Sequence, residues 1–180
     1  MRLPPIAALL LLPVLLGAGV AEPDGFRMDD YNAPVPDTLT GAHVVNAAGL
    51  AEALAAGAIA IDVLPAPRRP AKQPADQPWL PVPRMEVPGS LWWPDVGRGA
   101  INPAVDTWFR DRLASATGGD RDRVVAFYCK AACWMSWNAA KRAEGYGYRH
   151  LLWFPGGTEA WAEAGFQLQR GTPEAVPVGP

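Results

Sequence analysis

The sequence contains few of the residues from which metal sites are built. Of its 180 residues, only two are cysteine and two are histidine, and His43 and His150 stand far from other ligand types. We therefore expect no metal site and interpret both histidines as structural. The net charge is −2 with the two signs interspersed, so there is no basic patch of the kind that binds nucleic acid. No bound cofactor is expected either.

One long apolar run is present, and it stands at the start of the chain. Arg2 supplies a positive charge, residues 6–16 are apolar, and Gly19-Val20-Ala21 are small. This order is typical of a secretory signal peptide spanning 1–21, and the run is too short to cross a bilayer comfortably. We expect cleavage after Ala21 and export to an oxidising compartment, the bacterial periplasm, with no membrane attachment afterwards.

The remainder has the size of one domain. Residues 22–42 are polar, dotted with proline and without periodicity, which predicts an extended lead-in on the surface. The domain itself is expected at 43–166, with a proline-rich insertion at 64–85 that is too irregular for a helix or strand. Residues 167–180 are turn-rich and predict a loose tail.

Short apolar runs alternate with helical patterns along the domain. Strands are expected at 43–45, 58–63, 124–128 and 150–154, and helices at 46–56, 102–117, 136–144 and 155–161. This alternation predicts an α/β fold with a mostly parallel sheet and helices on both faces. In such sheets ligands bind beyond the carboxyl ends of the strands, where Asp62 and Cys129 are both expected.

Both cysteines lie in one loop. The strand at 124–128 ends at Cys129, and the chain continues Lys130-Ala131-Ala132-Cys133-Trp134 into a helix. A helix N-terminus stabilises a thiolate or a bound anion. We therefore predict that Cys129 is a reactive thiol at the mouth of a crevice, with Cys133 as its partner. The loop and crevice residues are expected to be Asp62, which orders the loop through hydrogen bonds, and Lys130, Ala131, Ala132 and Trp134.

The order of these motifs resembles a rhodanese-like domain. Ile61-Asp62-Val63 resembles the strand that ends in Asp-Val-Arg, and Val87-Pro88-Gly89-Ser90 resembles the His-Ile-Pro-Gly-Ala turn. Val125 to Cys129 resembles the strand that delivers the active cysteine, and Pro155 to Trp161 resembles the closing Gly-Gly-x-x-x-Trp helix. The resemblance implies a three-layer rhodanese-like fold and transfer of sulfur to or from a small sulfur or thiol compound.

A narrower resemblance surrounds the second cysteine. Phe127-Tyr128-Cys129 followed by Cys133-Trp134-Met135 is similar to exported proteins named PQQ-dependent catabolism-associated CXXCW motif proteins. It implies a partner in a periplasmic quinoprotein dehydrogenase system that oxidises alcohols. The spacing here is one residue longer than in that motif. Rhodanese-type sulfurtransferases also usually carry an Arg at the position of Leu64, which places thiosulfate in question as a substrate.

Three functions remain open on the sequence. In the first, Cys129 carries sulfur as a persulfide, and the N–H groups of the loop bind the terminal sulfur. In the second, Cys129 and Cys133 exchange between dithiol and disulfide. In the third, the domain is a binding module that uses Trp134, Trp137 and the proline-rich insertion as a contact surface, although packing is the favoured interpretation of both tryptophans.

Overall fold

The computed structural model describes residues 19–177. Most of the predicted signal peptide at 1–21 therefore lies outside the described residues, as does the end of the tail at 178–180. Within the described part, no helix has both the length and the apolar character needed to cross a membrane. The elements follow one another in the order β1 (Ala42–Val44), α1 (Ala47–Ala55), β2 (Ile59–Asp62), β3 (Met85–Glu86), β4 (Leu91–Trp92), α2 (Pro103–Thr117), β5 (Val125–Tyr128), α3 (Trp134–Gly145), β6 (Leu151–Phe154), α4 (Gly157–Glu163) and β7 (Gln169–Arg170).

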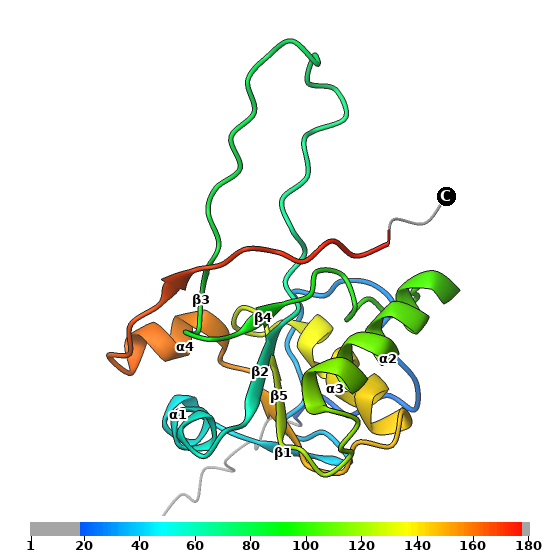
Figure 1. Cartoon of the computed structure of the whole chain (residues 1–180), viewed down its shortest axis with the longest axis vertical. Helices are drawn as coiled ribbons and strands as arrows, with labels where there is room; N and C mark the ends of the chain where they lie inside the picture. The colour runs from blue at the N-terminus through cyan, green and yellow to red at the C-terminus, as the bar shows by residue number, and fades with distance from the viewer. Residues whose placement is uncertain (1–18, 178–180) are drawn as a thin grey trace, which may run out of the picture.

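The central sheet confirms the predicted architecture. Its five strands run in the order β1-β6-β5-β2-β4, and each neighbouring pair is parallel. Helices α2 and α3 cover one face, and α1 and α4 cover the other (Figure 1). Since side chains alternate along a strand, β5 contributes Val125 and Phe127 to the core under α2 and α3, and Ala126 and Tyr128 to the core under α1 and α4.

The helix starts follow the capping residues in the sequence. The side chain of Asn46 accepts a hydrogen bond from the backbone N–H of Gly49, and that of Asn102 accepts one from Val105, with Pro103 at the first helical position. The third helix begins at Trp134, two residues earlier than the apolar periodicity indicated. Cys133 is its N-cap residue, so the second cysteine lies at the helix start itself.

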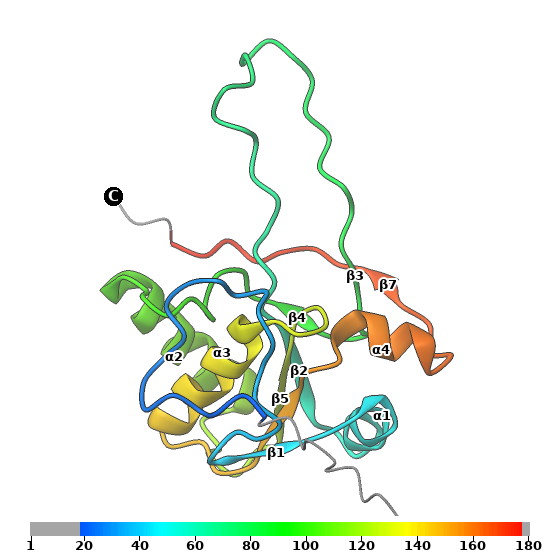
Figure 2. The ribbon, with the colours of Figure 1, turned by 180° about the vertical axis from the view of Figure 1, so that it is seen from behind.

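The lead-in has turns and bends but no helix or strand over 19–41, and it is tied to α3. Figure 2 shows it running alongside this helix. The buried amide of Asn138 donates to the carbonyl oxygen of Arg27 at 2.8 Å and accepts from the N–H of Arg27 at 2.9 Å. Further along, the indole N–H of Trp134 donates to Pro34 and that of Trp137 to Thr38. The lead-in therefore forms part of the covering of the cysteine loop.

The prediction of a loose tail is wrong for the described residues 167–177. Strand β7 pairs with β3 in an antiparallel two-stranded sheet that the sequence did not indicate. Beyond it, a carboxylate oxygen of Glu174 accepts from the indole N–H of Trp93 at 2.8 Å, and Glu174 also pairs with Arg112. Backbone pairing and one half-buried acceptor, Glu174, hold the tail, and neither leaves a periodic pattern in its sequence.

The proline-rich insertion is irregular, as predicted, and it projects far from the body between β2 and β3 (Figure 1). Leu80 and Val82 on its returning arm are 90% and 83% exposed. The tip is organised by its own contacts, because the guanidinium of Arg69 donates to the carbonyl oxygens of Ala75 and Gln77. The insertion ends at Arg84, which returns into the body.

The anchoring of the lead-in can be tested at Asn138. Replacing it with alanine leaves the half-buried N–H and carbonyl groups of Arg27, and the carbonyl of Gly97, without their partner. We expect Asn138→Ala to lower the free energy of unfolding by roughly 2–3 kcal/mol, measured by urea denaturation. The exposed Asn32 provides the control, and Asn32→Ala should change stability by less than about 0.5 kcal/mol. Equal effects of the two substitutions would show that the lead-in is not anchored there.

Candidate functional site

The candidate site is the loop between β5 and α3. Cys129 follows the last residue of β5 and Cys133 precedes the first residue of α3, and their sulfur atoms form a disulfide with the Cα atoms 6.1 Å apart. Both side chains are buried, with 0% and 2% of their surface exposed. The backbone at Ala131 and Ala132 is at the surface, so the disulfide lies directly beneath an exposed loop.

Cys129 was predicted to lie at the mouth of a crevice, but in this oxidised form its sulfur is buried and bonded to Cys133. Cys129 continues the alternation of Val125 and Phe127, and its side chain therefore joins the core under α2 and α3. The bond to Cys133 keeps it there. The loop opens to solvent on its backbone side, while the sulfur atoms face the protein interior.

The predicted binding of a terminal sulfur by loop N–H groups is also not available in this state. The N–H of Ala131 donates to a carboxylate oxygen of Glu159 at 2.9 Å. The N–H of Ala132 donates to the carbonyl of Pro155 at 3.2 Å, and that of Trp134 to the carbonyl of Tyr31 at 2.9 Å. The loop N–H groups that were expected to bind an anion are thus already hydrogen-bonded. Their acceptors come from α4, from the turn before α4 and from the lead-in.

Ala132 gives the loop its shape. Its φ of 51° places it in the left-handed region, which turns the chain back toward α3. A residue with a Cβ atom costs about 1–2 kcal/mol there. Such strain persists only where the surroundings hold it, and it is common at functional sites. Here the disulfide and the three hydrogen bonds of the loop hold it.

The start of α4 packs directly against the loop. Gly157 has a φ of 58°, and a Cβ atom at this position would overlap the backbone of Lys130 and Ala131. The next residue, Thr158, donates its backbone N–H to the carbonyl of Cys129 at 3.4 Å. Glycine is therefore required for α4 to come this close. The side chain of Lys130 is half-exposed beside this contact.

Asp62 was predicted to order the cysteine loop, and its carboxylate reaches that loop only through Arg84. It is fully buried, and one of its carboxylate oxygens accepts from the N–H of Leu64 at 2.9 Å. The other accepts from Nε of Arg84 at 2.8 Å. Burial raises the pKa of Asp62, and the charge of Arg84 opposes that shift. A buried carboxylate without this guanidinium would be costly, so the pair acts as a unit.

Arg84 is the functional residue that the sequence reasoning missed. Its Nη2 donates to the carbonyl of Cys129 at 2.8 Å and its Nη1 to the hydroxyl of Thr158 at 3.2 Å. The Arg that the rhodanese resemblance leads us to expect after Asp62-Val63 is Leu64 here, and Arg84 brings a guanidinium to Asp62 from the other end of the insertion. A signal existed in the sequence, because Arg84 is the only charged residue between Asp76 and Glu86.

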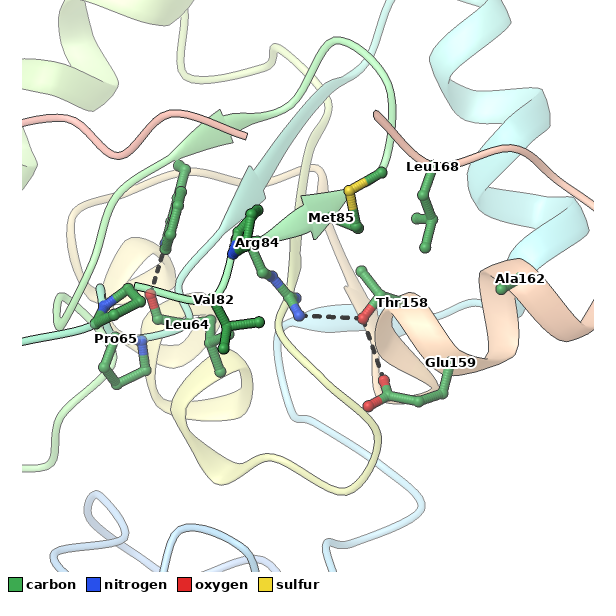
Figure 3. A pocket seen from close by; sticks show the side chains of 12 residues that line it. Leu64, Pro65, Val82, Arg84, Met85, Thr158, Glu159, Ala162 and Leu168 are labelled. Atoms are coloured by element: carbon green, nitrogen blue, oxygen red, sulfur yellow. Dashed lines mark hydrogen bonds between the residues drawn. The ribbon is translucent and has the colours of Figure 1, made fainter. Parts of the chain in front are cut away.

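A pocket of about 530 Å³ opens between the base of the insertion and α4. Figure 3 shows its polar members, Arg84, Thr158 and Glu159, joined by hydrogen bonds. Most of the remaining lining is apolar, including Leu64, Val82, Met85, Ala162 and Leu168. Neither cysteine lines it. All three polar members are hydrogen-bonded to the backbone of the cysteine loop, through the carbonyl of Cys129 or the N–H of Ala131.

Trp134 was predicted both as a loop residue and as a packing residue, and the structure supports packing. Trp134 and Trp137 are 2% and 0% exposed, with ring centroids 5.4 Å apart. The contact surface proposed for these tryptophans is therefore wrong, because the lead-in covers them. In residues 19–177, no group of three histidine, cysteine or acidic residues is placed to hold a metal ion.

Glu86 is a second buried carboxyl group near the site. It is 3% exposed in β3, and its Oε2 has no hydrogen-bond partner among the described residues. Burial raises its pKa to about 7, and the negative charge of Asp62 adds to the shift. Glu86 is therefore stable in this position mainly as the neutral acid.

Comparisons with known proteins identify the fold. No family model matches the chain, and no curated protein matches it. Among solved structures, the 3-mercaptopyruvate sulfotransferase SseA of Escherichia coli, described as having the "Rhodanese" fold, is 19% identical with a TM-score of 0.50. The match covers 75% of this chain and 53% of SseA, so this chain spans about half the length of that protein. The chain has the rhodanese fold.

Two further structures are similar at lower scores. The polysulfide-sulfur transferase homodimer of Wolinella succinogenes is 18% identical with a TM-score of 0.45, over 72% of this chain and 79% of that one. A human single-domain sulfurtransferase, TSTD1, is 17% identical with a TM-score of 0.41, over 69% of this chain and 96% of that one.

The buried state of Glu86 predicts a pH dependence. The pKa is about 7 in the folded protein and 4.5 in a model compound. The protonated Glu86 side chain therefore stabilises the fold fully below about pH 4.5, and this contribution is lost as the pH rises through about 7. Between about pH 5 and about pH 9, the wild-type protein should lose roughly 3 kcal/mol of unfolding free energy relative to Glu86→Gln, measured by urea denaturation. Parallel profiles of the two proteins would contradict the assignment.

Proposed function

We propose that the protein transfers sulfane sulfur through Cys129, and that Cys133 ends each transfer by forming the disulfide. The observation that carries the proposal is this disulfide, which closes the loop at the carboxyl end of β5 in a rhodanese fold. That loop is where the resemblance places the active cysteine. The oxidised form is then the product of one turnover and the resting state of the protein.

The two steps balance without a cofactor. In the reduced protein, the Cys129 thiolate attacks the outer sulfur of a small persulfide or polysulfide, and the donor leaves as a thiolate or a shortened polysulfide. Cys129 then carries the sulfur as a persulfide. The Cys133 thiolate attacks the inner sulfur of that persulfide, forms the disulfide and releases hydrosulfide. A thiol reductant returns both cysteines to the reduced state.

The position of Cys133 supports its role as the resolving thiol. It is the N-cap residue of α3, a helix of 12 residues, and the partial positive charge at this end favours a negative sulfur there once the disulfide is open. The two Sγ atoms are bonded in the structure, so attack of one cysteine on the other needs no rearrangement outside the loop.

A second function is favoured by the occupied loop N–H groups. With the N–H groups of Ala131, Ala132 and Trp134 donating to protein acceptors, a persulfide on Cys129 has fewer donors to stabilise it. Plain dithiol–disulfide exchange with another thiol compound needs no such stabilisation. The two functions differ in one product, because only sulfur transfer releases hydrosulfide.

We also propose that the protein works in the periplasm beside a quinoprotein dehydrogenase system. The support lies in the signal-like residues 1–21 and in the resemblance around Cys133-Trp134. A binding role there would use the projecting insertion, since Leu80 and Val82 are exposed and the tryptophans of α3 are not.

The roles of the two cysteines can be separated by intact-protein mass spectrometry after reduction and exposure to inorganic polysulfide. Cys133→Ser should gain the mass of one or more sulfur atoms and keep it, because nothing resolves the persulfide. The wild-type protein should lose two hydrogens and release one hydrosulfide per chain. Cys129→Ser should do neither.

Two outcomes would change the assignment. Full sulfur loading of Cys129→Ser would move the site away from Cys129. Oxidation of the wild-type protein by a small organic disulfide, together with no sulfur gain by Cys133→Ser in polysulfide, would favour dithiol–disulfide exchange over sulfur transfer.

A further inference from the structure

The three occupied N–H groups of the cysteine loop are not equivalent. Those of Ala132 and Trp134 donate to backbone carbonyls, of Pro155 and Tyr31, which cannot leave unless their segments move. That of Ala131 donates to the side chain of Glu159, which is exposed on the first turn of α4. Of the three, the N–H of Ala131 is the one that a rotation of a single surface side chain frees for a ligand.

Glu159 occupies this position as an anion would. Its Oε2 lies 2.9 Å from the N–H of Ala131 and accepts from the hydroxyl of Thr158 at 3.2 Å. These are the contacts of a carboxylate bound between a backbone donor and a hydroxyl. A negatively charged sulfur that approaches the loop from the pocket side meets a site already filled by a like charge (Figure 3).

The other charged groups around the loop offset Glu159 and leave no net positive charge there. Arg84 also borders the pocket, but its guanidinium is paired with the buried carboxylate of Asp62 at 2.8 Å. Lys130 is the remaining cation of the loop and is half-exposed to solvent. Arg84, Asp62, Glu159 and Lys130 together are close to neutral, so a ligand that carries more than one negative charge gains nothing there and is repelled by Glu159.

We propose that Glu159 determines the charge of the compounds that react at the cysteine loop, favouring thiols and persulfides with a neutral or cationic body over those with additional negative charge. The apolar lining near Leu64, Met85 and Leu168 holds the body of the compound beside Glu159, and its sulfur reaches the disulfide once the N–H of Ala131 is released and the loop opens. The part of this proposal that concerns sulfur donors depends on the proposed sulfur transfer. The part that concerns thiols does not depend on it, because thiols react with the disulfide itself.

The test uses attack of small thiols on the disulfide of the folded protein. A thiolate attacks one sulfur of the disulfide, forms a mixed disulfide with it and displaces the other cysteine as a thiolate; a second thiolate completes the reduction. Cysteamine, 2-mercaptoethanol and 3-mercaptopropionate are similar in size and carry a positive, no and a negative charge on the body. Rates are measured by acid quenching, alkylation and mass spectrometry.

The decisive comparison is between wild type and Glu159→Gln, which keeps an oxygen to accept from Ala131 but removes the charge. Because each thiol is compared with itself, differences in intrinsic reactivity cancel. The rate with 3-mercaptopropionate should rise about threefold to tenfold, that with 2-mercaptoethanol should rise less, and that with cysteamine should stay unchanged or fall. Glu163→Gln is the matched control, since Glu163 is exposed at the other end of α4. It should leave all three rates within about twofold of wild type.

Three results would overturn the proposal. The first is an equal change with all three thiols, which would show that Glu159 acts only on the stability of the loop. The second is the same pattern in Glu163→Gln, which would reflect net charge. The third is a disulfide that none of the thiols reduces in the folded protein. If polysulfide released no hydrosulfide, that result would count against the proposed sulfur transfer. The charge preference of Glu159 would still be decided by the rates measured with the three thiols.

Discussion

The covalent bond between Cys129 and Cys133 is the constraint on which the site depends. It joins the end of β5 to the start of α3 and holds Ala132 in a left-handed conformation that an alanine does not prefer. With the bond closed, both sulfurs belong to the core under α3, and only Lys130, Ala131 and Ala132 of the loop reach solvent. The redox state of this one bond therefore decides whether the loop contains a closed disulfide or two thiols.

Segments from distant parts of the chain meet at this loop. The lead-in reaches the N–H of Trp134 through Tyr31, the insertion reaches the carbonyl of Cys129 through Arg84, and α4 reaches the N–H of Ala131 through Glu159. Each makes only one or two hydrogen bonds to the loop, worth about 1 kcal/mol apiece. The contacts that hold β5 and α3 in the sheet and core are far more extensive, so opening of the loop is expected to be local.

Much of the fold could be predicted because its signals are local. Asn46 and Asn102-Pro103 indicate helix starts, and the unbroken apolar run at Val125–Tyr128 indicates a buried strand. The alternation of side chains along that strand also indicates that Cys129 points into the core, although its position in a loop suggested that it would be exposed. Arg84 and Glu159 could not be found this way, because each reaches the loop across a long separation in the chain. The pairing of the tail with β3 depends on backbone hydrogen bonds, which leave no mark on residue type.

Amide hydrogen exchange of the oxidised and the reduced protein tests the central claim most directly, that opening the disulfide frees the loop within an intact fold. On reduction, exchange in a peptide covering 129–134 should accelerate, with the N–H of Ala131 and Ala132 exposed, while β5 and the body of α3 stay protected. Acceleration throughout β5 and α3 would show that the disulfide is a structural bond of the core. Unchanged exchange in the loop would show that the two thiols remain closed off and that the site does not open.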